Sequence, residues 1–125
     1  MQEYAEGHLL TQSMVAYFWG HYLNGAEDGR HPHASPIYAG SLAGLPPAFV
    51  ITAECDPIRD QGEAYVEGLR ESGVPVAVKR YEGAIHAFFN LGGVVDAGRE
   101  AIADCAAALR TALRVPTNVA ASQSR

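Results

Sequence analysis

The chain has 125 residues, of which 48% are hydrophobic, and its formal net charge is −5. Its nine Lys and Arg residues are spread along the sequence, so no basic patch indicates a nucleic-acid partner. The apolar runs are far shorter than the roughly 20 residues of a membrane-spanning helix, and the opening residues MQEYAEG lack the basic start and apolar stretch of a signal peptide. We therefore expect one soluble, cytoplasmic domain without a membrane span.

The first predicted element is an amphipathic helix over residues 11–23. Thr11 or Ser13 can cap its start, and Asn24 with Gly25 marks its end. Such an apolar stripe could serve a cofactor or a membrane, but a face that packs against the rest of the protein is the commoner role. A polar loop rich in Gly and Pro follows over residues 25–36. The apolar side chains that recur with helical spacing are Met14, Val15, Phe18, Trp19, Tyr22 and Leu23.

The next two elements are a strand and a helix. Residues 48–54, AFVITAE, are short, apolar and partly β-branched, which predicts a strand buried on both faces. Residues 58–72 alternate inward apolar and outward charged side chains and end at Gly73, as an amphipathic helix does. The residues expected to face inward are Ile58, Tyr65 and Leu69.

A second strand and a last helix complete the predicted order. Residues 74–82, VPVAVKRYE, alternate valines with smaller or polar residues and predict a strand, followed by a loop over residues 83–90. Residues 96–114 predict a helix, and the polar segment 116–125 predicts a disordered tail. The expected inward face of this helix is Ala97, Ala101, Ile102, Cys105, Ala108, Leu109 and Leu113.

Strand, helix and strand in this order predict a right-handed parallel crossover, so the fold class is α/β. Two parallel strands make a sheet with exposed edges that is rarely stable alone. The pattern is therefore typical of the end of a larger doubly wound sheet, not of a complete one.

Two side chains with complementary chemistry follow the two predicted strands. Asp56 comes just after the first strand and His86 lies in the loop beyond the second. Adjacent parallel strands lie about 4.8 Å apart, and functional groups gather at their carboxyl ends. A carboxylate there can accept a hydrogen bond from the imidazole Nδ1–H and stabilise the imidazolium when Nε2 takes a proton. We therefore predict an orienting acid and a base, although Asp56 followed by Pro57 also suits a helix N-cap.

Other polar side chains have simpler interpretations. Glu54 and Asp60 are expected to be supporting or solvated, and Asp60 suits the first turn of a helix. His31 and His33 could suggest a metal, but without further ligands at metal-binding spacing a solvated loop is expected. We predict neither a metal nor a cofactor. Free thiols are expected at Cys55, a packing residue, and Cys105.

The motifs DPIRDQGEAY at 56–65 and YEGAIHAFF at 81–89 closely resemble the C-terminal part of the hormone-sensitive-lipase-like esterases, a branch of the α/β-hydrolases. ASP at 34–36 and LPPAFVITAE at 45–54 support this resemblance, which covers most of residues 5–113. It implies that residues 1–115 are the C-terminal portion of an α/β-hydrolase domain. It also implies a carboxylic-ester hydrolase, with Asp56 and His86 as triad members and small acyl esters as substrates.

Two catalytic motifs of these esterases are missing from this sequence. These esterases use a G-x-S-x-G nucleophile and an HGGG-type oxyanion loop, and in the α/β-hydrolase fold the serine precedes the Asp and the His. Neither motif occurs in this sequence. We therefore expect the chain to be inactive, or nearly so, by itself. Ile85, Phe88 and Phe89 are expected to be core residues or to line the acyl pocket.

Two other functions remain open at this point. The chain could be a non-catalytic fragment that pairs with an N-terminal half, or with a second copy, through its exposed sheet edge. It could also be a module that binds a ligand in the cleft beside Asp56 and His86 without chemistry.

Overall fold

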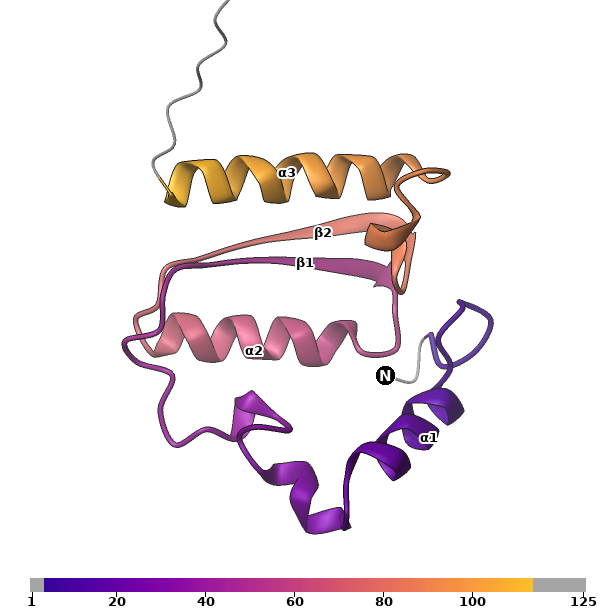
Figure 1. Cartoon of the computed structure of the whole chain (residues 1–125), viewed down its shortest axis with the longest axis vertical. Helices are drawn as coiled ribbons and strands as arrows, with labels where there is room; N and C mark the ends of the chain where they lie inside the picture. The colour runs from indigo at the N-terminus through magenta and orange to yellow at the C-terminus, as the bar shows by residue number, and fades with distance from the viewer. Residues whose placement is uncertain (1–3, 114–125) are drawn as a thin grey trace, which may run out of the picture.

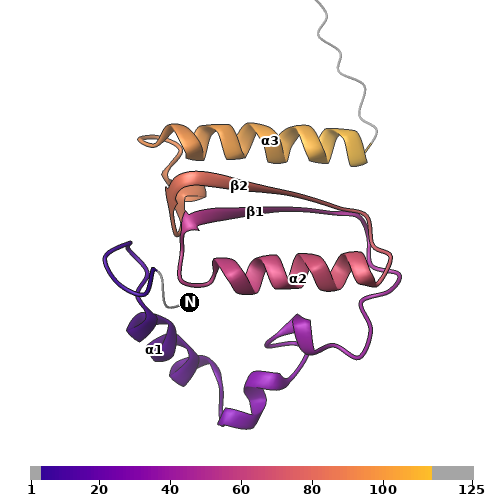
Figure 2. The same cartoon turned by 180° about the vertical axis from the view of Figure 1, so that it is seen from behind.

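The computed structural model describes residues 4–113 of the chain. A two-stranded parallel sheet lies between two helices, which cover its opposite faces (Figure 1). A further helix, α1, lies apart from this sandwich, on the side of α2 (Figures 1 and 2). The predicted tail over residues 116–125 falls outside the described residues. The elements are α1 (Gln12–Tyr22), β1 (Ala48–Cys55), α2 (Arg59–Glu71), β2 (Val76–Ile85) and α3 (Asp96–Ala112), with 3-10 turns at Ala26–Arg30, Pro36–Tyr38 and Phe88–Leu91.

The α/β class and the parallel crossover predicted from the sequence are confirmed. The prediction that β1 is buried on both faces is wrong, because only Thr52 and Ala53 are buried in it. β1 pairs with β2 alone among the described residues, so its other edge has no neighbouring strand to cover it. The sheet is therefore incomplete in the way that its sequence pattern indicates.

A small apolar core lies on each face of the sheet. On the α2 side, Leu69 packs with Leu42 and Val74, and Val66 is buried as well although the sequence pattern did not single it out. On the α3 side, Tyr81 and Phe88 pack against Ala101, with their rings 5.0 Å apart. These two clusters fix both helices on the sheet, and with them the loops at the carboxyl ends of the strands.

Helix α3 lies close to the sheet because small residues form its inner face. Ala101 is completely buried, and a Cβ added at Gly98 would lie 2.5 Å from the carbonyl oxygen of Phe88. The predicted inward face was therefore wrong for its three large residues: Ile102, Leu109 and Leu113 are 45%, 60% and 69% exposed. The close contacts of α3 with the sheet at Ala101 and with the 3-10 turn at Gly98 need small side chains, and this moves the large ones to the outside.

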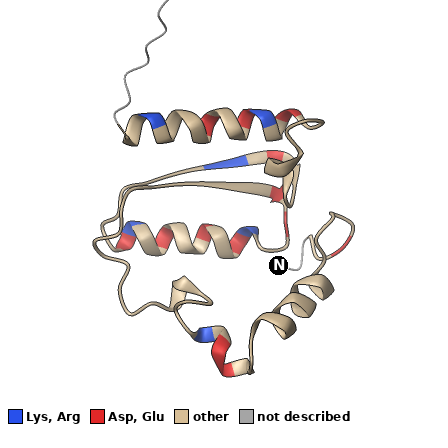
Figure 3. Ribbon diagram, in the orientation of Figure 1, with Lys and Arg blue, Asp and Glu red and all other residues tan. Residues whose placement is uncertain are grey.

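Ion pairs join the same layers across each face. On the α2 side, Glu63 accepts hydrogen bonds from Arg80 and from the Thr52 hydroxyl, and the contact with Arg80 holds the pKa of Glu63 below its usual value. On the α3 side, Asp104 accepts hydrogen bonds from Lys79 at 2.7 Å and from the Tyr81 hydroxyl at 2.6 Å. Basic and acidic residues are interspersed along α2 and α3, whereas α1 carries no Lys, Arg, Asp or Glu (Figure 3).

Helix α1 forms where the sequence predicted it, and the Thr11 hydroxyl accepts a hydrogen bond from the Met14 amide at 3.1 Å as its N-cap. Its packing differs from the prediction, because none of its residues is buried. Phe18 and Tyr22 are 54% and 67% exposed. No helix between residues 4 and 113 has the length and apolar character needed to cross a membrane.

Candidate active site

The carboxyl ends of β1 and β2 bring Asp56 and His86 together. Asp56 directly follows β1, His86 directly follows β2, and the distance from Asp56 Oδ2 to His86 Nδ1 is 2.8 Å. An ionised carboxylate only accepts hydrogen bonds, so this contact makes Nδ1 the donor and leaves Nε2 as the basic nitrogen. The Asp56 side chain is 11% exposed and that of His86 is 33% exposed. The acid is thus held inside while the imidazole reaches the surface.

The second oxygen of Asp56 fixes the turn that leads into α2. Oδ1 accepts a hydrogen bond from the Ile58 amide at 2.9 Å, and the Asp56 carbonyl accepts one from the Arg59 amide at 3.1 Å. Asp56 is therefore not the N-cap of α2 with Pro57 as its first residue, as the sequence suggested. Pro57 and Ile58 form a turn, Ile58 is the cap residue, and the helix starts at Arg59. This turn holds the carboxylate while its other oxygen binds His86.

The segment around His86 is more ordered than the predicted loop over residues 83–90. β2 continues to Ile85, which pairs with Cys55, so the first part of that loop prediction is wrong. After His86 the chain turns sharply at Ala87, which has a left-handed backbone with φ of 61°, and enters a 3-10 turn. The imidazole is therefore carried between a strand end and a tight turn, which limits its freedom.

The three apolar neighbours of His86 lie in different environments. Phe88 is buried in the core between the sheet and α3, Ile85 is half-buried in the ladder, and Phe89 is 37% exposed. Phe88 and Phe89 line a cavity of about 270 Å³ together with Asp56 and His86. Their role in substrate binding stays a prediction.

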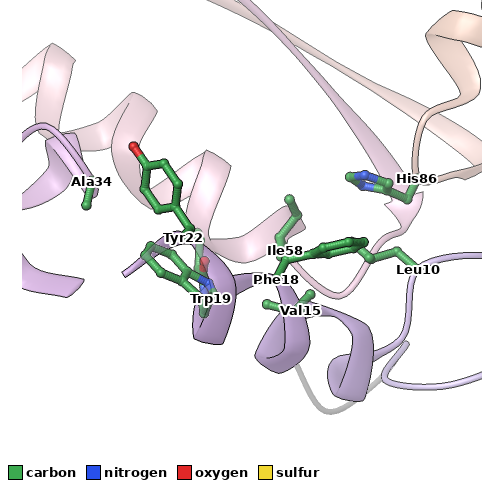
Figure 4. Close-up of a pocket in the computed structure, with 9 residues that line it drawn as sticks. Leu10, Val15, Phe18, Trp19, Tyr22, Ala34, Ile58 and His86 are labelled. Atoms are coloured by element: carbon green, nitrogen blue, oxygen red, sulfur yellow. The ribbon is translucent and has the colours of Figure 1, made fainter. Parts of the chain in front are cut away.

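A larger cavity of about 450 Å³ lies on the side of His86 that faces α1. The His86 ring is at one end of this cavity, Trp19 and Tyr22 lie toward the other, and the Phe18 ring extends between Ile58 and Leu10 (Figure 4). For these aromatic residues the sequence pattern favoured a packing face, and their helical spacing holds no signal for a cavity. The lining residues include Leu10, Val15, Phe18, Trp19, Tyr22 and Ile58.

The remaining candidate residues lie around this centre. Glu54 is half-buried and accepts a hydrogen bond from the Gly83 amide, while Asp60 pairs with Arg59 at 2.9 Å. The thiol of Cys55 is free and half-buried. The rings of His31 and His33 lie 4.9 Å apart, and between residues 4 and 113 no three His, Cys, Asp or Glu side chains are grouped to hold a metal.

Comparison with known proteins agrees with the fold. A sequence profile of the alpha/beta hydrolase fold matches residues 1–90. The chain therefore belongs to the α/β-hydrolase family.

Curated relatives that resemble this chain bear the names of esterases and carboxylesterases. It is 45% identical over 89 residues to an arylesterase of Saccharolobus solfataricus, covering 70% of this chain and 29% of that protein. It is 36% identical over 114 residues to carboxylesterase NlhH of Mycobacterium tuberculosis, covering 89% of this chain and 36% of that protein.

Solved structures show the same relationship in three dimensions. The thermophilic carboxylesterase EstE1 from a metagenomic library superposes with a TM-score of 0.84 at 41% identity, over 87% of this chain and 37% of that one. The hyperthermophilic esterase of Pyrobaculum calidifontis gives a TM-score of 0.80 at 42% identity, over 86% and 35%. The chain spans about a third of the length of these relatives.

Proposed function

We propose that this chain supplies the base and the orienting acid of a serine carboxylesterase, with His86 as the base and Asp56 as the acid. The observation that carries the proposal is the 2.8 Å contact between Asp56 Oδ2 and His86 Nδ1 at the carboxyl ends of two adjacent parallel strands. No G-x-S-x-G sequence occurs among the 125 residues. In this proposal the nucleophilic serine and the oxyanion-binding amides come from polypeptide outside them.

His86 moves the proton in each half of the reaction. As the serine oxygen bonds to the acyl carbon, its proton passes to His86 Nε2, and Asp56 stabilises the imidazolium through Nδ1–H. His86 then gives this proton to the leaving alcohol oxygen as the ester C–O bond breaks. In the second half His86 takes a proton from water, which attacks the acyl-enzyme, and returns it to the serine oxygen.

The cavity beside His86 supports a small apolar acyl ester as the substrate. Its volume of about 450 Å³ falls in the usual range for small-molecule sites, and its walls are mainly aliphatic and aromatic. Phe88 and Phe89, which line the smaller cavity beside His86, complete the proposed binding surface together with Ile85. Neither a metal nor a cofactor enters this chemistry, and a cytoplasmic location is part of the same proposal.

A chimaera tests the proposed roles. The N-terminal two thirds of the Saccharolobus solfataricus arylesterase would be joined to this chain, and hydrolysis of p-nitrophenyl esters measured after its folding is checked by circular dichroism. His86→Ala and Asp56→Asn are each expected to lower kcat by about 10⁴-fold. His33→Ala, in the exposed loop, is the matched control and should leave the rate unchanged.

Two results would contradict the proposal. One is a folded chimaera that hydrolyses esters equally well with and without the His86 imidazole. The other is measurable ester hydrolysis by the isolated chain that His86→Ala abolishes, because the nucleophile would then be present in these 125 residues.

A second candidate, a non-catalytic fragment that docks through its sheet edge, is favoured by the contrast between the two strands. β2 carries Lys79, Arg80 and Glu82, charges that discourage pairing at an edge, whereas β1 is uncharged from Ala48 to Ala53. β1 is therefore the edge offered to an N-terminal half or to a second copy. Light scattering after size exclusion over a range of concentrations tests this candidate, and a monodisperse monomer with cooperative unfolding would exclude it.

A further inference from the structure

The two strands change register just before the candidate active site. From the pair Ala48–Val76 to the pair Ala53–Tyr81, each β1 residue faces the β2 residue 28 positions further along. Cys55 instead faces Ile85, which is 30 positions further along. β2 therefore contains two extra residues at this point, and the segment 82–84 bulges opposite Glu54.

This bulge decides which residue meets Asp56. With the earlier register continued, Asp56 would face Ala84, and His86 would lie two positions beyond it. The two extra residues bring His86 level with Asp56, where the 2.8 Å contact forms. The hydrogen bond of the acid–base pair thus depends on the bulge as well as on the two residues themselves.

The Glu54 side chain joins the two strands at the bulge, and the Arg59 side chain binds the backbone of Glu54. Gly83, at its centre, has a φ of +69°, and its amide donates a 2.6 Å hydrogen bond to Oε2 of Glu54. A Cβ at Gly83 would meet nothing within 4 Å, so the glycine is needed for its backbone angle and not for space. Arg59 Nη1 donates to the Glu54 carbonyl oxygen at 2.9 Å, which links the same residue to the start of α2.

We propose that Glu54 is a positioning residue whose carboxylate holds the Gly83 bulge and thereby keeps His86 in register with Asp56. A hydrogen bond from an amide to a carboxylate is among the stronger ones, which suits it to hold an otherwise irregular backbone. The inference rests on the proposed role of His86 in ester hydrolysis. Its test uses the isolated chain, so that its failure and the failure of the proposed function can be told apart.

NMR of the ¹⁵N-labelled 125-residue chain gives the readout. The imidazole nitrogen shifts and the low-field Nδ1–H proton of His86 report its hydrogen bond to Asp56, and amide exchange at Gly83 reports the bulge. In Glu54→Ala we expect Gly83 to exchange about tenfold faster and the His86 Nδ1–H signal to be lost. Glu54→Gln keeps an acceptor oxygen and should retain both. Glu82→Ala removes a carboxylate from the bulge itself and is the matched control.

A folded Glu54→Ala chain that retains the His86 Nδ1–H signal would overturn the inference, as would an equal loss in Glu82→Ala. If Glu54→Ala does not fold, Gly83→Ala strains the same bulge through its backbone angle, and retention of the signal there would also overturn it. In the arylesterase chimaera, Glu54→Ala should lower kcat with little change in KM. An inactive chimaera would count against the proposed function and leave the NMR result standing.

Discussion

Helices α1 and α2 are similar in length but differ in how they are held. α2 buries Val66 and Leu69 against the sheet, whereas α1 buries none of its eleven residues. Both carry large apolar side chains, so the difference lies in what faces them. The segment from β1 to α3, residues 48–112, contains both core clusters apart from Leu42, and so provides its own packing. α1 is held by its Thr11 cap, and its apolar side chains line a cavity instead of a packed core. Its stability is therefore largely local, while that of the sandwich is cooperative.

The largest expected effect comes from truncating a matched pair of apolar side chains in the two regions. Leu69 is 2% exposed, so Leu69→Ala should leave a cavity and lower the free energy of unfolding by about 3 kcal/mol. Phe18 is 54% exposed, and Phe18→Ala should cost less than about 1 kcal/mol. Urea denaturation followed by circular dichroism measures both. Equal losses would show that α1 is as firmly packed as α2.

The same contrast between α1 and α2 explains which parts of the fold could be predicted from the sequence. Helix and strand positions follow from periodicity and capping, which are local, and the α/β class follows from their order. The burial of α1 and of β1 depends on neighbours, and no local pattern shows that Tyr22 stays exposed. The inner face of α3 was mispredicted for a related reason, because the close approach at Gly98 selects small residues that a hydrophobicity pattern undervalues.

The candidate site also has a part that could be predicted from the sequence and a part that depends on how the strands pair. The contact between Asp56 and His86 could be predicted because the carboxyl ends of adjacent parallel strands must be neighbours. The proposed role of Glu54 could not be predicted, because it depends on a register shift that appears only when the strands are paired. The sequence did contain one signal for the bulge. Gly83 lies where the predicted strand meets the predicted loop, and a glycine at such a place is typical of a bulge.

Alkaline pH should weaken the sandwich through one tyrosine. Burial, together with the hydrogen bond to Asp104, raises the pKa of Tyr81 to about 12, whereas the phenol in an unfolded chain ionises near 10.0. This contribution to stability is complete below pH 10 and is lost as the pH rises toward 12. Urea midpoints at pH 9, 10 and 11 should fall progressively.

Two variants assign that loss to its residue. Tyr81→Phe removes the ionisable group and should flatten the alkaline decline, although the hydrogen bond to Asp104 is lost at every pH. Tyr17→Phe removes a phenol of α1 that is 63% exposed and should leave the decline unchanged. If both variants flatten it equally, the alkaline transition does not belong to the sandwich.

The smallest expected effect is a gain within α1. Gly20 lies inside this helix, and a Cβ added there would meet nothing within 4 Å. Gly20→Ala should therefore stabilise α1 by about 0.5–1 kcal/mol, because alanine loses less backbone entropy in a helix. Helicity measured at 222 nm should rise, while the urea midpoint of the sandwich, followed by exchange of the Tyr81 amide, stays fixed. Gly98→Ala in α3 is the control and should lower that midpoint, because its Cβ meets the Phe88 carbonyl. A shift of the sandwich midpoint by Gly20→Ala would mean that the two regions unfold as one unit.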